Sequence, residues 1–212
     1  MATLGPEAAH IFRICHANNL PWILDHGLHC KNSDVQDPNF VSIGMADLIR
    51  KRDAHSVPTG PGGTLSDYVP FYFTPWSIMM LNIKTGHNDV SQRENADIVI
   101  LVTSLHKLRA SGVRYLFTNG HAFLRETDYF EDLADLVKVD WDLLRRKDFK
   151  RDPEDPGKLG RYQAEAIIHR HMPVDALSGI ACYDSRAQER VDREVQTRGL
   201  TLKVRAMSSW YF

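Results

Sequence analysis

Hydrophobic residues occur along the chain in short runs, separated by polar segments that often contain proline or glycine. This pattern is typical of β-strands and short helices joined by loops. The nearly continuous apolar run at 97–102 predicts a strand in the centre of a sheet. Other strands, predicted from alternation or from aromatic and β-branched content, lie at 11–16, 40–43, 65–73, 114–118, 166–169, 180–183 and 202–204. Pro70 favours an edge position or a boundary for its strand, because proline cannot donate to a β-ladder.

Helical segments are predicted between these strands. Asn18 or Asn19 is a candidate N-cap for the helix at 20–26, and Gly27 is a natural C-cap. Further helices are predicted at 47–52, 75–83, 105–110, 129–136, 141–145 and 186–197. Strands outweigh helices and do not alternate regularly with them, so the fold class is α+β. No linker divides the chain, so residues 1–212 are expected to form a single domain.

Charge and composition exclude several classes of protein. The formal net charge of −1 gives no overall basic field, so a nucleic-acid site would have to be a local patch. No apolar run approaches the roughly 18 residues of a membrane span, and residues 1–9 do not resemble a secretory signal. The three cysteines are widely spaced and fit neither a disulfide framework nor a zinc site. We therefore expect a cytoplasmic protein without a metal.

Two loops have compositions that suit a ligand site. The segment 57–63 contains three glycines and two prolines, so it is a mobile flap or a surface that a ligand approaches closely. The charged segment 150–158 leads to Glu165, which lies where a solvated loop enters the predicted strand at 166–169. A carboxylate held there can act as a catalytic acid or base. The alternative is a surface glutamate at the start of a strand.

Several motifs, taken in order, resemble one known family. They are Ile14-Cys15-His16-Ala17-Asn18-Asn19-Leu20, the basic segment 50–52 before the Gly/Pro loop, Asp67-Tyr68-Val69-Pro70-Phe71-Tyr72-Phe73, Phe117-Thr118-Asn119-Gly120-His121 and Gln163-Ala164-Glu165. Together they resemble the DarT toxins, which are DNA ADP-ribosyltransferases of DarT–DarG toxin–antitoxin pairs. The resemblance implies an ADP-ribosyltransferase (PARP-like) fold with central split β-sheets and flanking helices. It also implies NAD as co-substrate and a base of single-stranded DNA as acceptor, with thymine favoured over guanine.

The resemblance assigns roles to individual residues. Glu165 matches the catalytic glutamate, and Arg52 matches the active-site arginine. His16 matches a first-strand histidine that holds a ribose, and His121 matches a histidine near the active site. Arg13 and Cys15 stand where thymine-modifying members would have histidine and threonine, and Lys51 stands where arginine is usual. The residues expected to bind NAD are Arg13, Cys15, His16, Asn18, Tyr68, Tyr72, Phe73 and His121.

The loop before Glu165 supplies the residue types that a single DNA strand needs, namely cations for phosphates and a ring for a base. The residues expected to bind DNA are Lys150, Arg151, Lys158, Arg161 and Tyr162. Neighbouring Asp152, Glu154 and Asp155 equally fit a solvated loop. From the family, a DarG-type macrodomain antitoxin is the expected partner. Alternatives are transfer to RNA or protein, hydrolysis of NAD, or an inactive NAD-binding interaction module.

Overall fold

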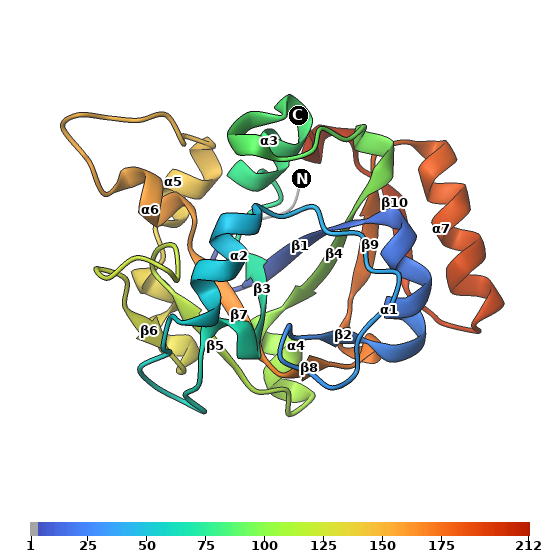
Figure 1. The fold of residues 1–212 in the computed structure, drawn as a ribbon, viewed down its shortest axis with the longest axis horizontal. Helices are drawn as coiled ribbons and strands as arrows, with labels where there is room; N and C mark the ends of the chain where they lie inside the picture. The colour runs from blue at the N-terminus through green and yellow to red at the C-terminus, as the bar shows by residue number, and fades with distance from the viewer. Residues whose placement is uncertain (1–3) are drawn as a thin grey trace.

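The computed structural model describes residues 4–212, which are built around an eight-stranded sheet with the strand order β10-β9-β4-β1-β3-β7-β5-β6 (Figure 1). The strands of this sheet are β1 (His10–His16), β3 (Tyr68–Tyr72), β4 (Ile98–Ser104), β5 (Tyr115–Thr118), β6 (Tyr129–Phe130), β7 (Glu165–His169), β9 (Gly179–Cys182) and β10 (Lys203–Ala206). The predicted α+β class is confirmed, and β4 is central as its apolar run predicted.

The sheet divides into two halves between β1 and β3. β1 pairs with β4 along its whole length, from His10 to His16. By contrast, β1 and β3 are registered only at Phe12 and Tyr72, so the two strands diverge beyond that point. The structure thereby has the split that the family resemblance implied, and the gap between the halves can hold a ligand.

Pro70 lies in this split, in a strand that is interior. β3 is bounded by β1 on one side and by β7 on the other, so the predicted edge position is wrong. The strand tolerates proline because β1 has already diverged from it there. The Pro70 carbonyl accepts a hydrogen bond from the Arg13 guanidinium at 2.8 Å in place of a ladder bond.

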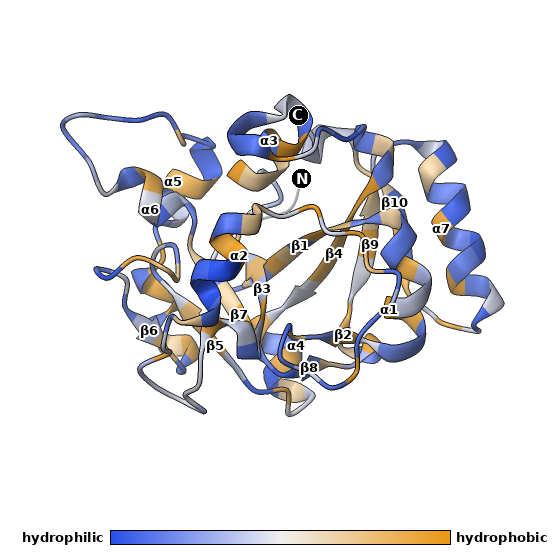
Figure 2. Ribbon diagram, in the orientation of Figure 1, coloured by the Kyte–Doolittle hydropathy of each residue, from blue (hydrophilic) through white to orange (hydrophobic). Residues whose placement is uncertain are grey.

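Helices cover both ends of the sheet and the split (Figure 1). α2 (Ala46–Asp53) lies in front of β1 and β3, while α7 (Ser185–Thr197) connects β9 to β10 and packs on both. The other α-helices are α1 (Leu20–His26), α3 (Ile78–Thr85), α4 (Leu105–Ala110), α5 (Trp141–Arg146) and α6 (Lys158–Tyr162). Figure 2 shows the expected division, with apolar strands inside and polar outer faces on α2 and α7.

Three local predictions are corrected. Residues 40–43 form no strand, and 129–136 form the short strand β6 followed by a 3-10 helix at Leu133–Lys138 in place of a helix. Asn19 occupies the N-cap of α1, but its side chain bonds the Val41 backbone and leaves the helix uncapped by a side chain. The sequence also gave no sign of a small second sheet, in which β2 (Leu28–His29) pairs with β8 (His171–Met172).

Candidate active site

Glu165 is the first residue of β7 and is 1% exposed, so it is not a surface glutamate. Its backbone N–H donates to the Thr118 hydroxyl at 3.0 Å, which fixes the start of the strand. Its Oε1 accepts the backbone N–H of Ala122 at 3.0 Å. The carboxylate is therefore held in one orientation by the strand β5 and by the loop that follows it.

Arg52 reaches this carboxylate from α2. Its Nη1 lies 3.1 Å from Oε2 and 3.5 Å from Oε1 of Glu165. The Arg52 side chain is 12% exposed, whereas Arg50 on the same helix pairs with Asp47 in solvent. Asp53 anchors the end of the helix by accepting from Lys31 and Ser66. Of the three consecutive cations, Arg52 is thus the one that α2 directs at Glu165.

His121 lies on the other side of Glu165, on the loop between β5 and β6. Its Nδ1 is 3.4 Å from Oε1 of Glu165 and accepts the backbone N–H of Phe123 at 3.2 Å. Because Nδ1 accepts this hydrogen bond, the neutral ring carries its hydrogen on Nε2. Burial lowers the pKa of His121, an effect that outweighs the opposing influence of Glu165, so the ring is neutral at physiological pH.

The environment keeps Glu165 ionised. Burial alone would raise its pKa, but the Arg52 guanidinium and the Ala122 N–H together hold the pKa below its ordinary value. Tyr72 is the cross-strand partner of Glu165. Burial and the Glu165 charge raise the pKa of Tyr72 to about 12, so its hydroxyl stays protonated.

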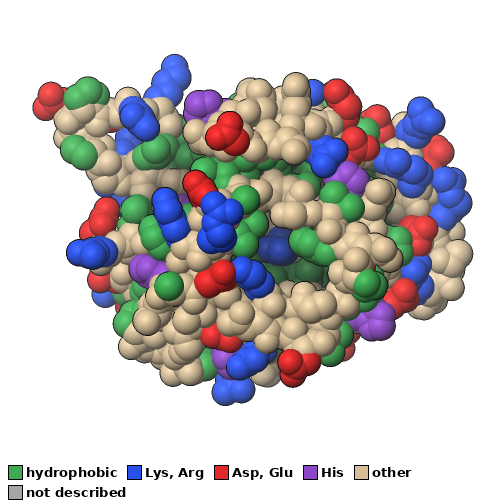
Figure 3. Space-filling model, viewed as in Figure 1, with side chains coloured by type: hydrophobic (Ala, Val, Ile, Leu, Met, Phe, Trp, Pro, Cys, Tyr) green, Lys and Arg blue, Asp and Glu red, His purple; other side chains and the backbone are tan. Residues whose placement is uncertain are grey.

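Two adjoining cavities, of about 190 and 370 Å³, open in the split beside this cluster. The smaller is lined by Arg52, Tyr72 and His121, and the larger by Trp22 and Tyr68. Their common walls include Arg13, Cys15, Phe40, Ser42, Ile49, Arg52 and Pro70. Figure 3 shows the hollow in the centre of this face, with hydrophobic and basic side chains around it. The larger cavity has the volume of a typical small-molecule site.

The wall between the cavities carries two arginines with unused donors. Arg13 Nε and Arg52 Nη2 are buried, and neither has a hydrogen-bond partner within residues 4–212. Burial lowers the pKa of Arg13, and none of the salt bridges among the described residues includes this side chain. Buried donors without partners are rare in folded proteins. They suit an anionic ligand with several oxygen atoms, such as a diphosphate.

The structure assembles several of the predicted NAD-binding residues at the cavities and separates others from them. Arg13, Cys15, Tyr68, Tyr72 and His121 all line one cavity or both. Burial raises the pKa of the Cys15 thiol to about 12, so that side chain is an inert part of the wall.

His16, Asn18 and Phe73, by contrast, line neither of the two cavities. His16 points to the opposite face of β1 from Arg13 and Cys15, is absent from both cavity walls, and accepts the Asn18 N–H through Nδ1. Asn18 is exposed beside α7. Phe73 is fully buried and packs against Phe117 and Trp141.

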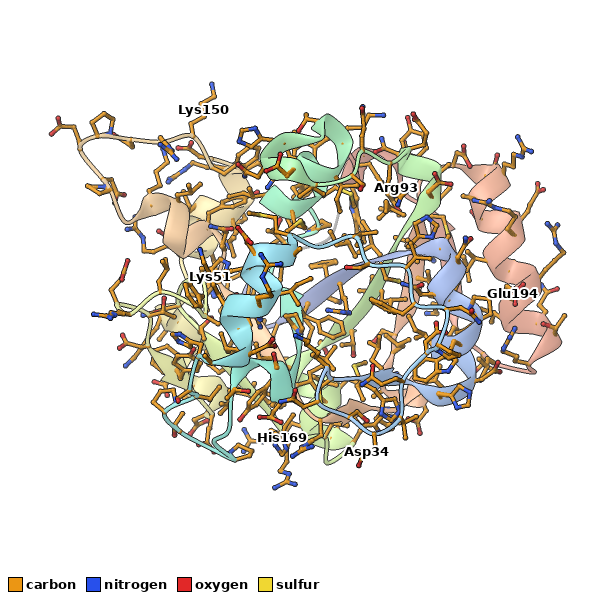
Figure 4. The ribbon with its side chains drawn as sticks, in the orientation of Figure 1. Asp34, Lys51, Arg93, Lys150, His169 and Glu194 are labelled. Atoms are coloured by element: carbon orange, nitrogen blue, oxygen red, sulfur yellow. The ribbon has the colours of Figure 1, made fainter. Side chains whose placement is uncertain are left out.

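Of the residues predicted to bind DNA, three are buried or paired with carboxylates and two are exposed. Tyr162 is 1% exposed and its hydroxyl donates to the Trp76 carbonyl, so it is a core residue. Lys158 is held by Asp148 and Asp152, and Arg161 by Asp140 and Asp155, on α6 rather than on a loop. Lys150 and Arg151 remain exposed, and Figure 4 shows Lys150 projecting from the segment before α6.

Two parts of the site were not anticipated from the sequence. One is the backbone N–H of Ala122, which holds Glu165. The other is the segment 40–45 with Met79, which covers the smaller cavity. A backbone donor has no side-chain signature, so only the tertiary structure reveals it. Within residues 4–212 no helix is long and apolar enough to cross a membrane.

Comparisons with known proteins agree with this geometry. The family model described as "ssDNA thymidine ADP-ribosyltransferase, DarT" matches residues 12–212. A DNA ADP-ribosyl transferase of Escherichia coli O127:H6 is 48% identical over 211 residues, covering 100% of this chain and 97% of the relative. The structure of Thermus sp. 2.9 DarT in complex with ADP-ribosylated ssDNA superposes with a TM-score of 0.90 at 30% identity, over 100% of both chains. The same Thermus protein in complex with NAD+ gives a TM-score of 0.86 at 30% identity, over 98% of this chain and 100% of that one.

Proposed function

Because the chain belongs to the DarT family of DNA ADP-ribosyltransferases, we propose that it transfers ADP-ribose from NAD to thymine in single-stranded DNA. The chain is an NAD-dependent enzyme of the ADP-ribosyltransferase class. The observation that carries the finer proposal is the ionised Glu165, buried beside a cavity and held by Arg52 and the Ala122 N–H. We further propose that residues 1–212 work as one domain.

Bound NAD supplies a glycosidic bond between nicotinamide and ribose, and breaking that bond leaves positive charge on the sugar. A fixed carboxylate stabilises such charge, as in other oxocarbenium-like displacements. Glu165 does not itself line the smaller cavity, but it contacts Arg52 and His121, which do, and it stays ionised. From this position it can stabilise that charge, hold a ribose hydroxyl and accept the proton of the attacking base. The Arg52 salt bridge contacts both carboxylate oxygens of Glu165 and so fixes the orientation of the carboxylate.

The two arginines between the cavities fit the diphosphate of NAD. A guanidinium donates in a fork that matches phosphate oxygens. Arg13 Nε and Arg52 Nη2 have no protein partner among the described residues, so phosphate oxygens can occupy those donors. The adenosine half would then lie in the larger cavity beside Trp22 and Tyr68, and the nicotinamide half in the smaller cavity beside Tyr72.

His121 can orient the acceptor base. Its Nδ1 is occupied by the Phe123 N–H, so Nε2 is the donor that remains, and the residue lines the smaller cavity. A carbonyl oxygen of thymine is a suitable acceptor for that hydrogen. Guanine also carries a carbonyl oxygen, so this donor could orient either base, and the preference for thymine rests on the family match.

The DNA strand requires exposed cations, and Lys150 and Arg151 meet that requirement. Lys147, whose Nζ lies 3.4 Å above the Trp76 ring, is close to them in sequence, and Lys51 lies on the exposed side of α2 (Figure 4). We assign phosphate contacts to these side chains in place of Lys158, Arg161 and Tyr162. A paired base would have to be flipped out of a duplex before it could enter such a cavity, whereas a single strand presents its bases without that cost.

The decisive experiment incubates the protein with NAD and four oligonucleotides, each containing one of the four bases within an inert context, and weighs the products. A mass gain equal to ADP-ribose on the thymine strand alone supports the proposal. Glu165→Gln, which preserves shape and removes the charge, is the matched control and should give no product. Gain only on guanine would overturn the base assignment, and gain only on RNA or protein would overturn DNA as the acceptor.

Modification of template bases would block DNA replication, so a cell that makes this enzyme needs protection from it. From the family, we propose a DarG-type macrodomain antitoxin as that partner. The test is co-expression. Cells that carry the active chain should stop DNA synthesis, and a DarG-type macrodomain protein should restore growth, while cells with Glu165→Gln should grow without it.

A further inference from the structure

Two hydroxyl groups near the site contact neither cavity, yet both bind the loop that holds the reactive side chains. The Thr127 hydroxyl donates to the His121 carbonyl at 3.0 Å. The Tyr129 hydroxyl donates to the Ala122 carbonyl. These carbonyls belong to two consecutive peptide groups, 121–122 and 122–123.

The N–H groups of the same two peptides point at the site. The Ala122 N–H belongs to peptide 121–122 and donates to Glu165 Oε1 at 3.0 Å. The Phe123 N–H belongs to peptide 122–123 and donates to His121 Nδ1 at 3.2 Å. Each peptide is therefore held at its carbonyl by a side-chain hydroxyl and offers its N–H to one reactive side chain.

Consecutive hydrogen bonds through one peptide group reinforce one another, because a carbonyl that accepts a hydrogen bond makes the N–H of the same peptide a stronger donor. The orientation of each peptide plane is also fixed, since rotating it would break the bonds at both ends. From this arrangement we infer that Thr127 and Tyr129 are positioning residues, which act through the peptides at Ala122 and Phe123 to hold Glu165 and His121 in their reactive orientations. The inference rests on the proposed function, because it assumes that those two side chains carry the reaction.

The surroundings of the loop support this assignment. A Cβ atom on Gly120 would lie 2.9 Å from the Thr127 hydroxyl, so the residue must be glycine for Thr127 to approach. The His121 N–H donates to the Gly160 carbonyl at 2.9 Å, which secures the loop from α6 as well. Burial raises the pKa of Tyr129 to about 12, so its hydroxyl remains a donor throughout the working range of pH.

The test compares Tyr129→Phe and Thr127→Val with matched controls that lose a hydroxyl elsewhere. Tyr115→Phe removes a half-buried tyrosine hydroxyl that has no hydrogen-bond partner among the described residues, and Thr85→Val removes one that bonds only within α3. For each positioning variant we expect kcat to fall about tenfold with KM for NAD within about twofold, the effect of losing one well-placed hydrogen bond. The controls should behave as wild type.

The pH profile separates positioning from a merely structural role. Glu165 works as a carboxylate, so a weaker bond from the Ala122 N–H raises its pKa, and the acidic limb of kcat moves to higher pH. An unmoved limb in both variants, or an equal loss of kcat in Tyr115→Phe, would overturn the inference. Testing both variants guards against one of them failing to fold.

A measurement without turnover keeps this inference distinct from the proposed function. The Glu165 carboxyl carbon can be titrated by ¹³C NMR and assigned by its absence in Glu165→Gln. A raised pKa of Glu165 in Thr127→Val, which frees the peptide whose N–H donates to Glu165, supports positioning even if wild type modifies no oligonucleotide, in which case the proposed function alone fails. A titration identical to wild type in both variants overturns the positioning role even if DNA transfer is established.

Discussion

Arg52 Nη1 lies 3.1 Å from Glu165 Oε2, and the two side chains, 113 residues apart in the sequence, are 12% and 1% exposed. A buried salt bridge is costly to break, because removing one partner leaves the other charge unpaired. One donor of this pair is unused, since Arg52 Nη2 has no hydrogen-bond partner among the described residues. The pair is thus arranged to bind a further anionic or polar group.

Replacing Arg52 should abolish most of the activity. In Arg52→Ala, Glu165 loses its main favourable charge partner and its pKa rises, so we expect transfer to DNA to fall about a hundredfold or more at neutral pH. Arg50→Ala is the matched control, because Arg50 lies on the same helix and pairs only with exposed Asp47. Steady-state transfer to an oligonucleotide is the measurement. Equal losses in the two variants would show that the helix and not the guanidinium matters.

Replacing Arg13 should have opposite effects on binding and on stability. In Arg13→Met the proposed diphosphate contact is lost, so KM for NAD should rise about tenfold or more. The same change removes a buried charge that has no carboxylate partner, so the free energy of unfolding should rise by about 1 kcal/mol. Urea unfolding and a titration of NAD measure the two effects. A variant that is both less stable and unchanged in KM would contradict the assignment.

Stability should fall as the solution becomes acidic below about pH 6.5. Burial lowers the pKa of six histidines in the folded chain: His10, His16, His29, His55, His121 and His169. A lowered folded-state pKa means that the unfolded chain binds these protons more tightly. The stability that the neutral histidines contribute is therefore complete above the unfolded pKa and is lost as pH falls from that value through the lower folded one. Urea unfolding at pH 7.5 and 5.5 tests this.

The acidic loss of stability should be smaller in His121→Asn, because one of these groups is then absent. At still lower pH, protonation of Glu165 also lowers the stability of the folded chain. Its folded pKa is depressed, so its contribution is complete above the ordinary glutamate pKa and disappears as pH falls through the folded value. Greater stability at pH 5.5 than at pH 7.5 would refute this account of the histidines.

Removing the exposed cations before α6 should weaken DNA binding without affecting NAD. For the double variant Lys150→Ala/Arg151→Ala, the slope of log K against log salt should decrease in magnitude by about 1.4, which corresponds to two lost phosphate contacts on a single strand. Lys203→Ala/Arg205→Ala, on the exposed edge strand β10, provides a control of equal charge. Fluorescence anisotropy with a labelled oligonucleotide at several salt concentrations is the measurement, and an equal change in slope in both double variants would rule out a local DNA path.

The ion pairs of α6 make a separate prediction about stability. The Lys158 ammonium lies 2.8 Å from Asp148, so Lys158→Met should lower the free energy of unfolding. Its effect on the salt dependence of DNA binding should be smaller than that of the Lys150 and Arg151 changes. If Lys158→Met alters the salt slope as much as they do, the sequence-based assignment of Lys158 to DNA was right after all.

The sequence by itself determined most of the strands around the site and the family, because strand periodicity and residue type are local properties. It also singled out Glu165, Arg52 and His121, which the fold brings into contact with one another. The sequence could not determine which cations lack acidic partners and are therefore available to bind DNA. Lys158 and Arg161 resemble Lys150 and Arg151 in the sequence, and only the folded chain places acidic partners beside the first two.

The tertiary structure also decided matters that depend on how strands separate and on which way they face. The position of Pro70 inside the sheet follows from the divergence of β1 and β3, which no local pattern encodes. By alternation His16 faces away from Arg13, and only the fold shows that the Arg13 face of β1 lines the cavities. The N–H that holds Glu165 belongs to the backbone of Ala122, and a backbone group acquires a role only when distant segments are brought together.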